Sequence, residues 1–412
     1  MSKIIVVGSG VIGLSVCDAL IHDGHDVILV DKNSPGSQTS FGNAGLIADY
    51  ANSPLANMDT LRKLPALLTN RRSGVSLDIR DIHKFVRYGN RFVKSASNQN
   101  YARNQKVLSK TLSLSMLAHV EQIERLNLHD LVLKNGCLHL YKDSQETEAD
   151  LIEIVEQKRK FDIECEFVSK ETVGTLEPSV NIDGVIGGVF HPQTQSLLSP
   201  EKHAEALFRS LCLNRNFTYV EESVVAFEQD GQSVWLETTH QQFKGDELVL
   251  CAGIGTNQLL AQHDIQVPVV SERGYHIELE KAELEVNRSI GWQGKYFFAT
   301  PMSDSIRLAG TTEFADGARN ARDQHHQLLE TWSQELFSQP TKVRSKWVGV
   351  RHSSPDGIPV IGRLSQMQRV STCFGHGHLG LTMAGFSGQF IKDMICGCAD
   401  QELLQAYALE RF

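Results

Sequence analysis

The first 31 residues contain the pattern that most constrains the fold: a strand, a glycine-rich turn, a helix and a second strand. Gly8, Gly10 and Gly13 follow the first strand with GxGxxG spacing, and Asp31 ends the second strand. In such a unit the glycines permit a tight turn, close approach of a pyrophosphate and packing of helix on strand. The helix N-terminus offers N–H groups to phosphates, and the acidic residue can bind ribose hydroxyls. The pattern predicts a dinucleotide-binding, Rossmann-like domain, but alone it does not distinguish FAD from NAD.

The rest of the chain changes character several times. Helical periodicity occupies residues 82–93 and 108–123, and alternating apolar residues across 267–308 predict antiparallel strands, closed by a helix at 323–337. Strands at 347–351 and 359–362 then lead to a glycine-rich segment and a final helix. We expect an α/β fold with an α+β second domain. The cofactor domain is assigned to 1–80, 145–265 and 345–412, and a discontinuous substrate domain on an antiparallel sheet to 81–144 and 266–344.

Charge and hydropathy exclude some classes of protein. Forty Lys and Arg against 49 Asp and Glu give a net charge of −9, the wrong sign for a nucleic-acid binder. No apolar run reaches the roughly 18 residues of a membrane helix, and the chain begins directly with a strand, so we expect a cytoplasmic protein. Residues 61–68, followed by Arg71 and Arg72, mix apolar and basic side chains. They permit peripheral contact with the inner membrane face, although a solvated surface helix is the favoured interpretation.

The eight cysteines indicate reduced thiols rather than a metal site. They are scattered, and none has the spacing of a zinc site with a second cysteine or with histidine. Cys396 and Cys398 are interpreted as small residues that close a helix. We predict no metal.

Seven segments, in this order and spacing, carry a resemblance to a known family. They are VVGSGVIGLSVCDAL at the start, then SFGNAGLIADY, VLCAGIGTNQLL, RGYHIE, RLAGTTEF, HSSPDGIPVIGR and GHGHLGLTMAG. From end to end the sequence resembles the D-amino acid dehydrogenases, D-amino acid oxidases and glycine oxidases. It is most similar to bacterial D-amino acid dehydrogenases, including the branch acting on D-proline or D-hydroxyproline. The resemblance implies a D-amino acid oxidase-like fold and FAD as cofactor.

The resemblance also assigns residues to FAD. Residues 40–45 would lie along the pyrophosphate and the flavin ring, 224 beside the adenine, and the backbone N–H groups of 377–382 near the negative charge of the reduced ring. No cysteine precedes residues 354–356 where some relatives attach the flavin, so non-covalent FAD is expected. The full predicted set is Gly8, Gly10, Val11, Ile12, Gly13, Asp31, Lys32, Ser40, Gly42, Asn43, Ala44, Gly45, Leu46, Val224, Cys251, Ala252, Gly253, Gly377, His378, Leu379, Gly380, Leu381 and Thr382. A proton-transfer role for His376 or His378 is the lesser alternative.

Arg351 is the main substrate candidate. It matches the arginine that holds the substrate carboxylate in related oxidases, and a guanidinium can form two parallel hydrogen bonds with a carboxylate. A salt-bridging arginine is the alternative, and His352 replaces the usual proline. Tyr50 and Arg273 are further candidates that could equally be structural.

The predicted reaction is oxidative deamination of a D-amino acid. The α-hydrogen leaves as hydride to flavin N5, and the imine hydrolyses to a 2-oxo acid; no catalytic acid or base is assigned. A dehydrogenase is favoured over an oxidase, with a quinone or an electron-transfer protein as a candidate acceptor. The alternatives are an oxidase of glycine, sarcosine or another secondary amine, an NAD-dependent dehydrogenase, and a flavin-binding subunit or sensor without turnover.

Overall fold

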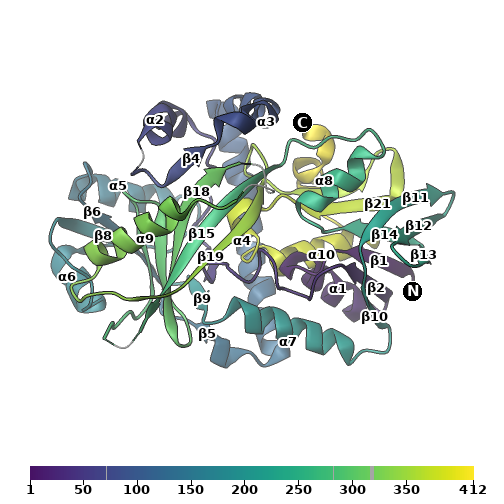
Figure 1. The fold of residues 1–412 in the computed structure, drawn as a ribbon, viewed down its shortest axis with the longest axis horizontal. Helices are drawn as coiled ribbons and strands as arrows, with labels where there is room; N and C mark the ends of the chain where they lie inside the picture. Colours follow the sequence, from purple (N-terminus) through teal and green to yellow (C-terminus); the bar gives the residue numbers. More distant parts are fainter. Residues whose placement is uncertain (71, 282, 316–319) are drawn as a thin grey trace.

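The computed structural model describes residues 1–70, 72–281, 283–315 and 320–412, and two sheets organise them (Figure 1). The smaller of the two has the strand order β10-β2-β1-β14-β21-β20. Five of its strands are parallel and β20 is antiparallel to β21. The bounds are β1 Lys3–Val7, β2 Asp26–Asp31, β10 Phe217–Glu221, β14 Glu247–Leu250, β20 Val360–Leu364 and β21 Met367–Phe374.

Both faces of this parallel sheet are covered, as the continuous apolar runs of β1 and β14 require. On one face α1 (Val11–His22) packs beside α10 (Ala384–Ile395), with α4 (Asn98–Leu126) against α10. The antiparallel β11 (Val224–Asp230), β12 (Ser233–Thr238) and β13 (Gln242–Gly245) form a separate small sheet whose apolar side chains join the core on the other face. The predicted Rossmann-like unit is therefore confirmed.

The second sheet is nine-stranded, with the order β19-β15-β18-β17-β16-β6-β8-β7 and β4 paired to β18. Helix α9 (Asp323–Leu336) covers one face, where His325 stacks on Tyr275 with 4.6 Å between ring centroids. The strands are β4 Val75–Leu77, β6 Cys137–Lys142, β7 Glu166–Ser169, β8 Val185–His191, β15 Val270–Glu280, β16 Ser289–Trp292, β17 Phe297–Pro301, β18 Ser305–Phe314 and β19 Val343–Ser353.

Strand pairing differs from the domain division expected from the sequence. β7 and β8, within the segment 145–265 assigned to the cofactor domain, pair with β6 in the larger sheet. Similarly, β19 begins before residue 345 and pairs with β15. Because hydrogen bonding places these strands in the second sheet, we propose that the substrate domain also includes about 145–191 and 343–353.

The remaining elements connect the two sheets. Three short strands form a further sheet with the order β3 (Leu46–Ile47), β9 (Gln195–Leu197) and β5 (Val132–Leu133). The other helices are α2 Met58–Thr69, α3 Ile82–Ser95, α5 Glu148–Arg159, α6 Lys170–Leu176, α7 Pro200–Cys212, α8 Ile254–Ala261 and α11 Gln401–Tyr407. Helix α11 follows α10, so α10 is not the final helix as expected. Across the four described stretches, no helix has both the length and the apolar character needed to cross a membrane.

Candidate functional site

Four predicted cofactor segments meet at one edge of the parallel sheet, because each follows the carboxyl end of a strand. The N–H of Gly8 donates to Val30 O at 2.9 Å, and the N–H of Cys251 donates to Val7 O at 2.7 Å. The glycine-rich segment after β21 begins at the same edge with Gly375. This edge is where open α/β sheets bind their ligands.

The first turn is shaped for a close approach of backbone and ligand. Gly8 has φ +104°, and a Cβ there would lie 2.6 Å from Cys251 O. A Cβ on Gly13 would lie 1.8 Å from Gly8 O. Gly10 is the N-cap of helix α1 and has no side chain to cap it, and the first turn of the helix holds no acidic residue. The turn therefore fits a pyrophosphate on the helix N-terminus.

Asp31 holds this turn in place. Its carboxylate accepts hydrogen bonds from the N–H of Ser9 at 2.7 Å, Ser9 Oγ at 2.9 Å and the N–H of Asn33 at 2.9 Å. Its position at the end of β2 fits contact with an adenosine ribose. Lys32 is exposed and Val224 is half-buried at the start of β11, and neither position by itself identifies a ligand contact.

The loop of residues 40–46 lies between the two sheets. Ser40 Oγ accepts the first amide of α1, Val11 N–H, at 3.0 Å. On the other side, Arg307 of β18 donates to Phe41 O at 3.1 Å and to Asn43 O at 2.7 Å. The loop thus links the cofactor edge to the larger sheet.

Trp347 covers this loop, and the sequence did not identify it as part of the site. A Cβ on Gly42 would lie 2.0 Å from Trp347 Cζ3, so only glycine allows the indole to pack there. The indole stacks on His276 with 5.0 Å between centroids, and His276 Nδ1 lies 3.0 Å from Gly42 O. His276 and Tyr275 are buried packing residues.

The glycine-rich segment after β21 also contacts this loop region. Gly375 and Gly377 have φ of +80° and +53°. Thr382 Oγ1 accepts the N–H of Ala48 at 3.1 Å and donates to Leu46 O at 3.3 Å. Predicted FAD residues from distant parts of the chain therefore converge, and the set fits an adenine dinucleotide that extends from α1 toward the larger sheet.

Arg351 lies on the face of the larger sheet that this loop covers. Its guanidinium lies over Gly274 of the neighbouring strand, where a Cβ would be 2.3 Å from Arg351 Cζ. Arg351 Nη1 lies 3.5 Å from Glu272 Oε1 but forms no hydrogen bond with the residues described. The side chain is 21% exposed. The guanidinium is thus partly neutralised and still has donors for a ligand.

Glu272, which the sequence analysis missed, joins Arg351 to the glycine-rich segment. Its Oε1 lies 2.9 Å from His378 Nε2 and accepts Thr312 Oγ1 at 3.1 Å. Its Oε2 accepts Ser353 Oγ at 2.8 Å. Burial alone would raise the pKa of Glu272, but His378, Arg351 and Ser353 together lower it well below its usual range. A buried glutamate between two candidate segments was visible in the sequence only as one charged residue in a strand.

Arg273 does not reach this site. Successive side chains of a strand point to opposite faces, so Arg273 lies on the face of β15 opposite to Gly274 and Arg351. There it is buried and its Nη1 lies 3.2 Å from Glu313 Oε2, next to the Tyr275 hydroxyl that also binds this carboxylate. We therefore assign Arg273 to the packing beneath α9 and do not propose it as a substrate residue.

Tyr50 lies in a buried cluster that includes Leu46 of the loop of residues 40–46. Its ring packs against His139 and His191, with centroids 4.4 and 4.6 Å away. These histidines belong to β6 and β8, and β15, β18, β17 and β16 separate β6 from the strand that carries Arg351. The structure does not bring Tyr50 and Arg351 together.

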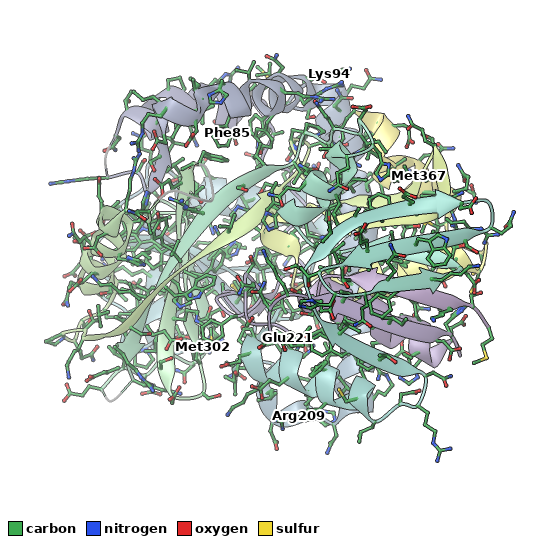
Figure 2. The ribbon with its side chains drawn as sticks, turned by 45° about the vertical axis from the view of Figure 1, so that its right-hand side comes forward. Phe85, Lys94, Arg209, Glu221, Met302 and Met367 are labelled. Carbon is green, nitrogen blue, oxygen red and sulfur yellow. The ribbon has the colours of Figure 1, made fainter. Side chains whose placement is uncertain are left out.

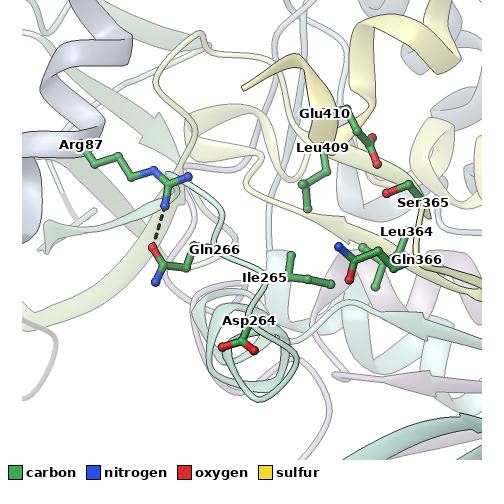
Figure 3. Close-up of a pocket in the computed structure, with 9 residues that line it drawn as sticks. All are labelled: Arg87, Asp264, Ile265, Gln266, Leu364, Ser365, Gln366, Leu409 and Glu410. Carbon is green, nitrogen blue, oxygen red and sulfur yellow. Dashed lines mark hydrogen bonds between the residues drawn. The ribbon is translucent and has the colours of Figure 1, made fainter.

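Other features of the described residues lie away from this junction. Asp23, His25 and Cys396 place three potential ligand atoms within 4.8 Å of one another, where His25 Nε2 already contacts Asp23 at 3.1 Å. Each of the eight cysteines carries a free thiol, and Cys396 caps α10 as expected. A cavity of about 340 Å³ is bordered by Arg87, which donates to Gln266 at 2.7 Å (Figure 3). None of its lining residues belongs to the predicted sites.

Comparison with known proteins identifies the family. The family model described as "FAD dependent oxidoreductase" matches residues 3–394. A D-amino acid dehydrogenase of Vibrio atlanticus is 26% identical, over 100% of both chains. A D-amino-acid oxidase of Bradyrhizobium diazoefficiens is 23% identical, over 99% of this chain and 98% of the relative. Among solved structures, glycine oxidase from Geobacillus kaustophilus has a TM-score of 0.79 at 16% identity, over 100% of both chains.

Proposed function

The chain belongs to the family of FAD-dependent oxidoreductases, and on this premise we propose that it oxidises D-amino acids to 2-oxo acids, as a dehydrogenase with non-covalently bound FAD. The names of its relatives support a D-amino acid substrate. The family match excludes the NAD-dependent alternative. D-Proline and D-hydroxyproline remain within the proposed substrate class.

The observation that carries the proposal is the position of Arg351. Its guanidinium lies on the sheet face beside the loop of residues 40–46, with Nη1 free of hydrogen bonds among the described residues. A guanidinium whose donors remain available suits a carboxylate, because two parallel N–H bonds can form at once. This supports a substrate with a carboxylate rather than a simple amine.

The residues of this chain would divide the work as follows. Gly8, Gly13 and Asp31 would hold the adenosine diphosphate end of FAD, and residues 40–46 the part near the ring. FAD supplies the hydride acceptor when it is bound. Arg351 would bind the substrate carboxylate and orient the α-carbon, while Trp347 and His276 pack against Gly42 of the loop.

Anaerobic reduction of the purified flavoprotein tests the proposal. The visible flavin band should bleach with D-amino acids and not with their L-enantiomers. Bleaching by glycine or sarcosine alone would favour the secondary-amine alternative, which the fold of the glycine oxidase neighbour also permits. A yellow protein that no amine or amino acid reduces would support a flavin-binding subunit or sensor.

We further propose that the enzyme contacts a membrane surface and passes electrons to a quinone there. Residues 55–95 contain nine Lys and Arg but three Asp and Glu, in a chain of net charge −9. Ile79, Ile82, Val86 and Val93 in this segment are all more than half exposed. Figure 2 shows Phe85 of α3 on the side of the sheet and Lys94 on the outer side. An exposed face with apolar and basic side chains suits an anionic lipid surface.

Sedimentation with vesicles of anionic lipid tests this contact. Val86→Asp should reduce the bound fraction several-fold, because it places a charge on the apolar face. Leu213→Asp is the matched control, since Leu213 is 88% exposed on the opposite part of the molecule near α7. Equal binding by the two variants would contradict the proposal.

A further inference from the structure

His378 and Glu272 form a titratable pair beside Arg351 that the reaction described above does not use. His378 Nε2 lies 2.9 Å from Glu272 Oε1, and Arg351 Nη1 lies 3.5 Å from the same oxygen. The imidazole therefore lies next to the group that would hold the substrate carboxylate. Any amino acid bound by Arg351 has its amine one carbon away from that carboxylate.

Glu272 is fixed more firmly than a surface carboxylate. Its side chain is 4% exposed, and Thr312 and Ser353 donate to its two oxygens. By contrast, the His378 side chain is 44% exposed, and among the described residues its contact is the one between Nε2 and Glu272, with no hydrogen-bond partner for Nδ1. One ring nitrogen is thus held by a buried carboxylate while the other remains available.

The reaction itself creates a need for a proton acceptor. An amino acid in neutral solution carries an ammonium group, and the nitrogen lone pair must be free before the α-hydrogen leaves as hydride. The arrangement of a carboxylate that orients an imidazole, which then accepts a proton through its other nitrogen, is a recurring solution for proton transfer.

We propose that His378 accepts the proton of the substrate ammonium through Nδ1, oriented by Glu272 through Nε2. This inference rests on the proposed function. One N–H bond of the ammonium breaks and one Nδ1–H bond forms, with no change in oxidation state. The imidazolium then releases the proton to water, because the ring is partly exposed.

Charged and polar groups from three elements lie around His378. Glu272 on β15 is negative and Arg351 on β19 is positive. Burial, followed by the charges of Glu272 and Asp356, raises the pKa of Tyr88 on α3 well above its usual range, so it stays neutral. His376 in the same segment is buried with its Nε2 2.9 Å from Ser387 Oγ. His378 is thus the exposed imidazole of this group.

Nuclear magnetic resonance of ¹⁵N-histidine in the holoenzyme tests the proposal without turnover. The probe is 2-aminoisobutyrate, which has an ammonium and a carboxylate but no α-hydrogen and so binds without being oxidised. The His378 signal is assigned as the one that is missing from the spectrum of His378→Asn. At pH 8 this signal should change from that of a neutral imidazole to that of an imidazolium when the probe binds. An unchanged signal with bound probe would overturn the proposal.

The pH profile of kcat/KM gives a second measurement. In His378→Asn, kcat/KM should fall about 100-fold at pH 7, which is at the low end of the range for general acid–base groups. Its rate should approach that of the wild type at high pH, where the free amine is present in solution. His240→Asn, which changes an exposed histidine in the turn between β12 and β13, should leave the profile unchanged.

Glu272→Gln separates orientation from charge. The amide can still accept a hydrogen bond from His378, but the lost negative charge should move the acid limb of the profile to lower pH by about 1 unit. A uniform loss of rate at all pH values would indicate a structural role and overturn the proposal. If D-amino acids reduce the flavin but His378 does not titrate, this inference alone fails. If no amino acid reduces the flavin, the proposed function fails and the inference with it.

Discussion

At the scale of single residues, the candidate site depends on Glu272, whose carboxylate lies beside Arg351, the arginine predicted to bind the substrate carboxylate. Glu272 lies within 3.5 Å of Arg351 and lowers the positive charge available to a substrate. The two oxygens of Glu272 are bound by His378, Thr312 and Ser353, and its one contact with Arg351 is not a bidentate pair. The arginine is therefore positioned by its neighbour but not occupied by it.

Arg351→Met should remove charge-assisted hydrogen bonds worth about 1.5 to 3 kcal/mol each. We expect kcat/KM for D-amino acids to fall at least about 10-fold per lost bond. Flavin reduction by stopped flow measures this effect. Arg344→Met is the matched control, since Arg344 lies on the same strand but is exposed and bound to Asp304. An unchanged kcat/KM in the Arg351 variant would remove the carboxylate-binding role.

The sequence allowed the glycine residues of the site to be predicted, because their signal is local. Gly8 and Gly13 stand in one short motif between a strand and a helix, and the structure gives both the close contacts that exclude a Cβ. Glu272 and Trp347 were missed for the opposite reason. Their positions depend on the register between β15 and β19, which pairs Glu272 with Arg351 across 79 positions of chain. The same register, together with the alternation of side chains along a strand, places Arg273 on the face of the sheet opposite to Arg351.

At the scale of helices and strands, α1 and α10 cross in close backbone contact. A Cβ on Gly388 of α10 would lie 2.2 Å from Ser15 O and 2.6 Å from the Ser15 carbonyl carbon of α1. Backbone atoms are unable to yield as a flexible side chain does, so this glycine sets the distance between the helices. Because α1 carries the cofactor turn and α10 follows the segment 377–382, the crossing also fixes these segments relative to each other.

Gly388→Ala should therefore lower the free energy of unfolding by about 1 to 3 kcal/mol, the usual cost of overpacking, and weaken FAD retention. Gly89→Ala is the matched control, since Gly89 lies in α3 and a Cβ there meets nothing within 4 Å. In that variant the higher helix propensity of alanine should leave stability unchanged or raise it by up to about 1 kcal/mol. Urea unfolding of both variants measures the difference, and equal effects would refute the packing argument.

Most strands and helices were predictable because their periodicity is a property of adjacent residues. The helices over 82–95 and 98–126 follow their apolar stripes, and the block of strands from 270 to 314 follows its alternation. The domain boundaries were not predictable in this way. β8 has an ordinary strand sequence, and only its pairing with β6, almost 50 residues earlier, assigns it to the larger sheet.

At the scale of the whole molecule, the two large sheets are joined by the segments that also form the candidate site. The loop of residues 40–46 contacts α1 through Ser40 and the larger sheet through Arg307. His276 and Trp347 add buried aromatic contacts at the same place. Conditions that charge buried groups near this junction should therefore affect folding and cofactor binding together.

Buried histidines make this dependence on pH specific. Burial lowers the pKa of seven histidines, among them His191, to about 3, and His203, to about 4. The set is His119, His139, His191, His203, His276, His325 and His352. Because the folded pKa lies below the ordinary value of about 6.5, the unfolded chain binds protons first as the pH falls. The stabilising effect is therefore present above pH about 6.5 and is lost progressively below it.

The free energy of unfolding should thus fall between pH 7 and pH 5, by up to about 1.4 kcal/mol per pH unit for each such histidine. His203→Leu should make this slope shallower, because both ring nitrogens of His203 are buried without a partner among the described residues and no polar contact is lost. His22→Asn, at a histidine with a 56% exposed side chain, should leave the slope unchanged. Urea titrations at several pH values measure the slopes. A slope in His203→Leu equal to that of the wild type would show that this imidazole is able to take up its proton inside the folded protein.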